Sequence, residues 1–132
     1  MLNDGRNKEN RPKDNIKALQ ERMKRFGLAV IHMTEKLPST RAANVISAQI
    51  IRSGTSPGAN YRAACRARSK AEFIAKMGIV EEELDETLYW LEVLVEAGLL
   101  AKIDAEPLAE EGDELLGIVV ASIRTARKSP SR

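Results

Sequence analysis

Apolar residues recur at the spacing of an α-helix along most of the chain. Between Pro12 and Pro38 they fall on one narrow stripe with lysines opposite, which predicts an amphipathic helix that starts near Pro12 and is ended by Pro38. Ser39 or Thr40 can cap a second helix that runs to about Ala67. The stripe of the first helix comprises Ile16, Leu19, Met23, Phe26, Val30, Met33 and Leu37.

Two further helices are indicated by capping signals. Ser69 is followed three residues later by Glu72, a capping box that predicts the start of a third helix, and Gly98 is a natural stop for it. Asp104 can cap a fourth helix that has Pro107 in its first turn. Short connections favour antiparallel neighbours, so the expected fold is all-α, an up-down-up-down four-helix bundle.

The bundle is expected to occupy residues 12–128 as a single domain. A chain of 132 residues is too short for two cores, and a composition with 4% aromatic residues, five prolines and eight glycines favours helices over sheets. Residues 1–11 are polar and without apolar periodicity, which predicts a flexible N-terminal arm. Residues 129–132 are expected to fray.

The middle of the second helix breaks the rules for a regular helix. Pro57 removes the hydrogen bond to the Ser53 carbonyl, at a cost of about 3 kcal/mol, and predicts either a kink near Pro57 or two separate helices. Gly54 and Gly58 lie one turn apart and have no side chains, so a neighbouring backbone can approach closely there. The alternative for this helix-packing motif is an anion-binding nest of backbone amides at the kink.

The sequence of this segment is similar to that of a known family. Residues 52–60 read Arg-Ser-Gly-Thr-Ser-Pro-Gly-Ala-Asn and resemble the signature of the four-helix-bundle proteins first noticed in intervening sequences of 23S rRNA. Matching blocks at 73–77 and 86–94 extend the resemblance over 26–98. It implies a four-helix bundle that assembles as a pentameric ring. The family also includes the accessory variability determinant of diversity-generating retroelements, which implies a reverse-transcriptase partner.

The net charge of +2 conceals a strong separation of charge along the chain. Residues 1–25 are net +4 and residues 41–76 net +6, whereas residues 81–114 hold thirteen acidic side chains against Lys102 alone. Such asymmetry predicts either a surface that binds a charged ligand or complementary self-association.

Basic residues of the second helix are the candidate nucleic-acid contacts. At 100° per residue its four arginines fall within an arc of roughly 80°, a row that could follow the phosphates of RNA or DNA. The alternative is that they pair with the acidic third helix. Tyr61 lies opposite the row and is expected in the core rather than as a base-stacking platform. The candidates are Arg41, Arg52, Arg62, Arg66, Arg68 and Lys70, the last two beyond the end of the row.

Surplus apolar residues predict an oligomer interface. The third helix already has a full core stripe, yet it carries a second apolar set on roughly its other side, and the first helix has two apolar residues beside its lysines. In an isolated bundle these would face water. We therefore expect a homo-oligomer in which acidic and basic faces meet through Leu28, Ile31, Ile79, Tyr89, Trp90 and Val93.

Catalytic and metal chemistry find little support. With His32 the only histidine, multi-histidine metal sites are excluded, and the di-iron helix-bundle pattern fails because Ala29 stands where glutamate is required. Cys65 could pair with His32 as nucleophile and base, but a small buried thiol is the commoner role. The acidic run 81–86 favours a solvated or interface face. We expect no enzyme, no catalytic residue, no metal and no cofactor.

The expected location is the cytoplasm. The lone Cys65 cannot form an intramolecular disulfide, and no apolar stretch approaches the roughly 20 residues of a membrane span.

Taken together, the sequence favours a non-enzymatic, oligomeric helical bundle that binds structured nucleic acid through a basic surface, as an accessory to a reverse transcriptase or another RNA-handling enzyme. The alternative is a structural or protein-interaction module whose charged faces serve self-assembly only.

Overall fold

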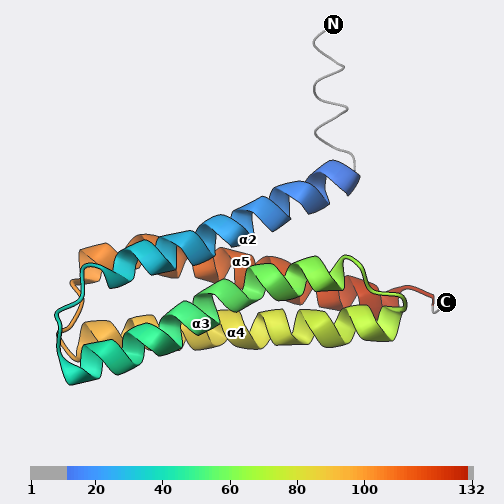
Figure 1. The fold of residues 1–132 in the computed structure, drawn as a ribbon. Helices are drawn as coiled ribbons and strands as arrows, with labels where there is room; N and C mark the ends of the chain where they lie inside the picture. Colours follow the sequence, from blue (N-terminus) through green and yellow to red (C-terminus); the bar gives the residue numbers. More distant parts are fainter. Residues whose placement is uncertain (1–11, 131–132) are drawn as a thin grey trace, which may run out of the picture.

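The computed structural model describes residues 12–130, which form four α-helices and no strand (Figure 1). The all-α, four-helix prediction is confirmed. The predicted arm 1–11 and residues 131–132 of the predicted tail lie outside the described residues. The helices are α2 (Pro12–Thr34), α3 (Arg41–Ala64), α4 (Lys70–Glu96) and α5 (Lys102–Lys128).

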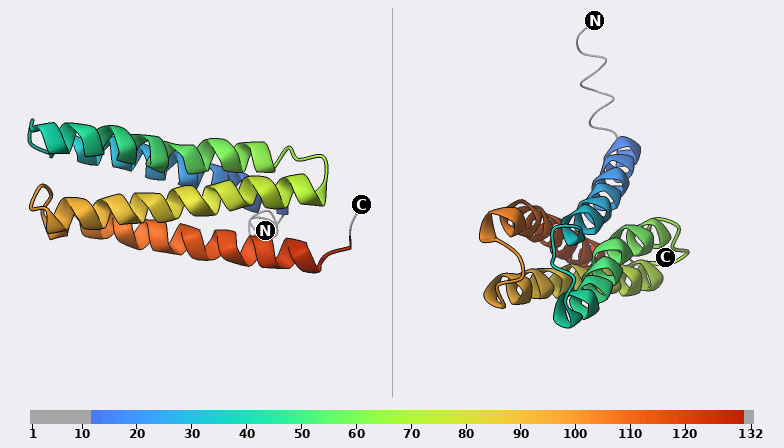
Figure 2. Two further views of the ribbon diagram at one scale, coloured as in Figure 1. Left: turned by 90° about the horizontal axis from the view of Figure 1, so that it is seen from below. Right: turned by 60° about the vertical axis from the view of Figure 1, so that its left-hand side comes forward.

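Each helix packs against its neighbours in the sequence. The contacts of α2 with α3, α3 with α4 and α4 with α5 are extensive, and those between α2 and α5 are fewer. Figures 1 and 2 show the chain running back and forth along the bundle, with α2 rising away from the other helices toward its N-terminus. Ile16 therefore remains 42% exposed, although it was expected on the inward stripe. None of the helices in the described range could cross a bilayer.

Local capping signals account for most of the helix ends. Thr40 Oγ1 accepts the Ala43 N–H at 3.2 Å, and Ser69 Oγ accepts the Glu72 N–H at 3.0 Å. Just past α4, Gly98 adopts a φ of +75°, a left-handed conformation that favours glycine.

The predicted cap of the fourth helix is wrong. Helix α5 begins at Lys102 after Ala101, which makes no side-chain cap bond, so Asp104 lies inside the first turn. The Asp104 carboxylate instead accepts a hydrogen bond from Lys36 Nζ at 2.9 Å. A contact with the α2–α3 connection has replaced the local one.

One hydrophobic core runs through the bundle. Tyr61 belongs to it, only 6% exposed, and burial raises the pKa of its phenol, as expected for core packing. The other large, fully buried apolar side chains are those of Met23, Phe26, Val30, Ile50, Met77, Val80, Leu84, Leu94, Leu115 and Val119.

Helix α3 is continuous through the buried Pro57, so the alternative of two separate helices is excluded. The kink stays a prediction. Helix α3 ends at Ala64, three residues before the expected Ala67.

Candidate nucleic-acid interface

Glycines set the approach of α2 to α3. A Cβ atom on Gly54 would lie 2.8 and 2.9 Å from the two γ carbons of Val30, and one on Gly27 would lie 3.1 Å from the Gly54 carbonyl oxygen. A Cβ on Gly58 would meet the backbone of Met23 and Lys24 at 3.5 to 3.6 Å, which is ordinary contact. Gly27 was missed in the sequence, although a glycine inside an amphipathic helix is a signal of close packing.

The continuity of α3 also bears on the anion-binding nest considered at Gly54 and Gly58. Because Gly54 and Gly58 lie inside a continuous helix, most amides around them are used within that helix. The backbone here is helix rather than the loop that a nest requires.

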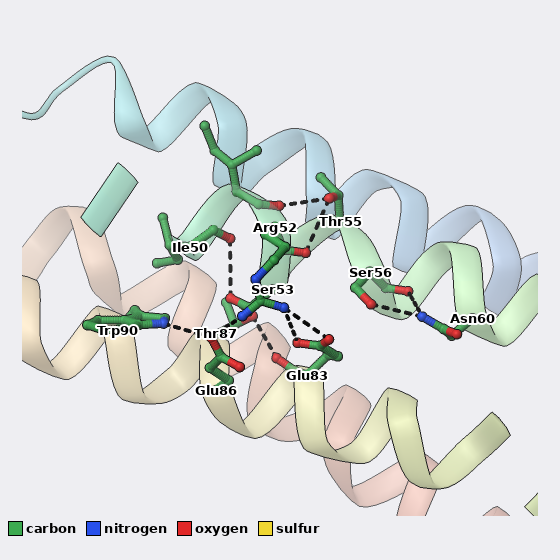
Figure 3. A network of polar contacts seen from close by, with 11 residues as sticks. Ile50, Arg52, Ser53, Thr55, Ser56, Asn60, Glu83, Glu86, Thr87 and Trp90 are labelled. Carbon is green, nitrogen blue, oxygen red and sulfur yellow. Dashed lines mark hydrogen bonds and ion pairs between the residues drawn. The ribbon is translucent and has the colours of Figure 1, made fainter. Parts of the chain in front are cut away.

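Polar side chains on the other side of this segment connect α3 to α4 (Figure 3). Arg52 Nη1 lies 3.0 and 3.1 Å from the two carboxylate oxygens of Glu83, and Arg52 Nη2 donates to Glu86 Oε2. The indole N–H of Trp90 donates to the same Glu86 oxygen at 3.0 Å. The guanidinium pKa of Arg52 is raised by these hydrogen bonds, first to Glu86 and then to Glu83.

Beneath this network lies a buried pair of hydroxyl groups. Thr87 Oγ1 is 2.9 Å from Ser53 Oγ and 2.8 Å from the Glu83 carbonyl oxygen. Both side chains are fully buried, and each has a partner. One turn further along α3, the Asn60 amide donates to Ser56 Oγ at 2.8 Å. The polar residues of segment 52–60 therefore join α3 to α4 and stabilise α3 itself.

The Arg52 network makes a testable prediction about pH. The pKa of Glu86 is held below its usual 4.5, first by the Trp90 hydrogen bond and then by Arg52. Because the folded pKa is depressed, the stabilisation by this carboxylate is present above pH 4.5 and is lost as the pH falls through the folded pKa. Trp90 is the only tryptophan, so its fluorescence should change with a midpoint below pH 4.5. In Arg52→Met we expect this midpoint to move upward.

The matched control is Arg41→Met, which removes an exposed arginine at the first residue of the same helix. It should leave the midpoint unchanged while far-UV circular dichroism confirms that the bundle stays folded. Equal midpoints in the wild type and Arg52→Met would show that Arg52 does not act on Glu86.

A groove of about 530 Å³ opens between α2 and α3, with Gly27 and Gly58 in its lining. Arg62, in the last turn of α3, and Arg66, two residues past the end of that helix, line it together with Lys24 from α2. Within the described part of the chain, no carboxylate lies within ion-pair distance of either arginine. The complete lining is Gln20, Glu21, Met23, Lys24, Gly27, Leu28, Ile31, Thr55, Gly58, Ala59, Arg62 and Arg66.

The electrostatic field at this groove is positive. Its single acidic residue, Glu21, accepts a hydrogen bond from Lys24 Nζ at 3.0 Å. The pKa of Glu21 is lowered by Lys24 first, and the charges of Arg25 and Lys17 lower it further. On the larger scale, residues 12–69 hold eleven basic and three acidic side chains, a net charge of +8, whereas residues 70–130 hold six and fourteen, a net charge of −8.

The structure brings only some of the predicted basic residues together. Arg62 and Arg66 share the groove, and Arg66 and the exposed Arg68 both lie in the connection between α3 and α4. Arg52 pairs with α4, which agrees with the alternative that the arginines pair with the acidic third helix. Arg41 lies at the opposite end of α3. The Lys70 ammonium donates to the carbonyl oxygens of Arg127 and Ser129 at the end of α5, which ties Ser129 of the predicted tail to the bundle.

The predicted interface residues are exposed to different degrees. Leu28 is 49% exposed, Ile79 36% and Tyr89 56%. Ile31 and Val93 are half-buried, and Trp90 packs against the core. The tryptophan ring meets Tyr89 edge-on, with 5.1 Å between the ring centroids. Because Trp90 and Val93 are partly buried, the expectation that the whole α4 set faces water holds only in part.

The structure does not assemble the candidate catalytic pair. His32 lies in the last turn of α2 and Cys65 at the end of α3, which are at opposite ends of the bundle (Figure 1). In the acidic run, Glu83 and Glu86 are held by Arg52. Among residues 12–130, no group of His, Cys, Asp or Glu is arranged to hold a metal ion.

Comparison with known proteins identifies a family that the chain matches. Residues 15–121 match the family model described as 23S rRNA-intervening sequence protein. A comparison with curated proteins finds no match. The chain is similar to a crystal structure of a protein of unknown function from the S23 ribosomal protein family of Bacteroides thetaiotaomicron, with 32% identity and a TM-score of 0.74 over 80% of this chain and 97% of that one. The chain therefore belongs to the 23S rRNA-intervening sequence protein family.

Proposed function

We propose that this protein is a non-enzymatic, self-associating bundle that binds structured nucleic acid through the groove between α2 and α3. The observation that carries the proposal is the pair of guanidinium groups, Arg62 and Arg66, on one groove wall without a carboxylate partner in the described chain. Guanidinium groups bind phosphate oxygens in a bidentate manner, and two of them lining one groove offer two phosphate contacts.

The chemistry of the groove favours the backbone of the nucleic acid over its bases. The apolar lining residues Met23, Leu28 and Ile31 offer no hydrogen bonds with which to read base edges, and the buried Tyr61 is unavailable for stacking. Thr55 Oγ1 already donates to the Ile51 carbonyl oxygen at 2.7 Å, which leaves Gln20 as the one neutral lining side chain able to contact a base edge. Phosphate contacts position a ligand without reading its sequence. We therefore assign little base discrimination to this site, and Arg68 is an additional exposed contact beyond it.

Self-association would strengthen such binding. One protomer offers few contacts, but several grooves on one assembly would bind a folded RNA with an avidity above that of each groove. Leu28 at the groove edge, with Ile79 and Tyr89 on α4, supplies exposed apolar surface for the assembly. A ring of five subunits, a reverse-transcriptase partner and a cytoplasmic location are parts of the proposal that rest on the resemblance and on the lone cysteine.

The test is fluorescence anisotropy with a labelled RNA hairpin and a labelled DNA duplex, titrated from low to physiological salt. If Lys24, Arg62 and Arg66 each neutralise one phosphate, the logarithm of the association constant should fall against that of the salt concentration with a slope of about −2 to −3 per protomer. Absence of binding at low salt would contradict the proposal.

The second candidate is an interaction module without a nucleic-acid ligand. The observation that favours it is Arg52, whose charge is already taken up by Glu83 and Glu86. If the remaining arginines meet carboxylates of a neighbouring subunit in the same way, the protein will self-associate but will not bind RNA.

A further inference from the structure

A second groove, of about 420 Å³, lies between the C-terminal half of α4 and the N-terminal half of α5. It is formed by the opposite pair of helices from the groove that carries Arg62 and Arg66. Its lining consists of Asp85, Leu88, Leu91, Glu92, Val95, Glu96, Lys102, Ala105, Glu106, Ala109, Asp113 and Leu116.

The rim of this groove is acidic and not neutralised within the described chain. Other carboxylates of α5 are held by cations, as Glu111 and Glu114 are by Arg22 and Asp104 is by Lys36. None of the groove's acidic residues makes an ion pair with any described residue, and Lys102 is the one basic side chain among the lining residues. These acidic residues are Asp85, Glu92, Glu96, Glu106 and Asp113.

Its floor has the shape that a helix requires. Leu88, Leu91 and Val95 follow one another along α4 at intervals of three and four residues, and Ala105 and Ala109 stand one turn apart on α5. The small alanine side chains leave room for a third helix to approach. The α4 wall from Asp85 to Glu96 is about 16 Å long, or three helical turns.

We infer that this groove is a docking site for a cationic amphipathic helix of a partner protein. Leucine-like anchors spaced at three and four residues would contact the apolar floor, as in other helix-in-groove complexes. Lysine or arginine side chains flanking the anchors would face the five carboxylates of the rim. The inference concerns a different face from the proposed nucleic-acid site and does not depend on it.

The exposed surface of the helices between residues 12 and 130 does not supply such a helix. On α2 the exposed large apolar residues, Ile16 and Leu28, are twelve positions apart and so point about 120° away from each other. On α4 the exposed pair Ile79 and Tyr89 lies in the acidic segment of the chain. The large apolar side chains exposed on the described helices are Ile16, Leu28, Val45, Ile79, Tyr89 and Ile103, and no two of them stand three or four positions apart on one helix. Ile31, three positions from Leu28, is half-buried in the α2–α3 groove. This favours a partner of different sequence over a second copy.

The probe is a labelled peptide of roughly 14 residues made only of leucine and lysine, with leucines at positions i, i+3, i+4 and i+7. One comparison peptide has the same composition with its leucines spread around the helix, and another has glutamate in place of lysine. We expect anisotropy to show binding of the amphipathic lysine peptide about tenfold or more tighter than that of either comparison peptide. Amide chemical-shift changes should map to α4 and α5.

Charge-reversed variants locate the site. Glu92→Lys/Glu106→Lys should weaken binding of the lysine peptide by about tenfold, whereas Glu82→Lys/Glu110→Lys, the same charge change at exposed positions outside the groove, should change it by less than about threefold. Equal losses in the two double variants, or equal binding of the amphipathic and spread peptides, would overturn the inference. Sedimentation of the protein alone gives the third outcome: if Glu92→Lys/Glu106→Lys dissociates an oligomer, a second copy occupies the groove and the inference fails.

Discussion

We expect Gly54→Ala to lower the free energy of unfolding by about 1–3 kcal/mol, the range for inserting a methyl group into a well-packed core. The new Cβ would lie 2.8, 2.9 and 3.0 Å from three side-chain carbons of Val30. Val30 is fully buried and β-branched, so it has no alternative rotamer into which to retreat. The gain in helix propensity, at most about 1 kcal/mol, offsets only part of the loss.

The measurement is urea unfolding followed by far-UV circular dichroism at one fixed protein concentration, because self-association would shift the midpoint. Gly58→Ala is the matched control, one turn away on the same helix. Its Cβ would make ordinary contacts with α2, so it should be neutral or stabilising by up to about 1 kcal/mol.

A double variant tests the cause. If the clash with Val30 is responsible, Gly54→Ala/Val30→Ala should be less destabilised than the sum of the two single variants. Simple additivity, or a Gly54→Ala protein as stable as Gly58→Ala, would refute the close-packing role of Gly54.

The second large effect concerns nucleic-acid affinity. Arg62→Glu/Arg66→Glu should weaken RNA binding about 100-fold at low salt and make the salt slope shallower by about 2, because two phosphate contacts are lost and replaced by repulsion. Both side chains line the groove and neither bonds to a described carboxylate, so the fold should tolerate the change. The measurement is the anisotropy titration described above.

The control variant is Arg124→Glu/Arg127→Glu, which reverses two exposed charges on α5 outside the groove. It should change the affinity by less than about threefold after allowance for general screening. A similar loss in both double variants would mean that only the overall field matters. If Arg62→Glu/Arg66→Glu instead dissociates an oligomer, the arginines belong to a subunit interface.

The parts of the fold that sequence could predict depend on neighbours a few residues away. Ser69 and Glu72 form a cap because their contact spans three residues, and Gly98 ends α4 through its own backbone conformation. The same logic failed for Asp104, whose partner Lys36 is 68 positions away. A local sequence pattern holds no information about a partner that is so distant along the chain and that competes with the helix cap for the same side chain.

In the candidate site, too, the sequence predicts local features but not contacts between residues that are distant along the chain. Helical angles predict Arg52, Arg62 and Arg66 on one side of the second helix, although Arg66 lies past the end of α3. Whether each arginine is available to a ligand depends on what the adjacent helix presents. Glu83, 31 positions further along, binds Arg52, whereas Glu21, the acidic residue of α2 in the groove with Arg62 and Arg66, is paired with Lys24. The helical spacing of the arginines does not indicate which of them has a carboxylate partner in the folded chain.

The opposite charges of the two helix pairs, +8 for residues 12–69 and −8 for residues 70–130, make the protein a large electric dipole. Near a polyanion such a molecule experiences a torque, so it approaches with α2 and α3 leading before any contact forms. Its α4–α5 side would then face away, into solvent. Encounter with a nucleic acid would thus leave the acidic groove accessible, and the two faces could be occupied at the same time without competing.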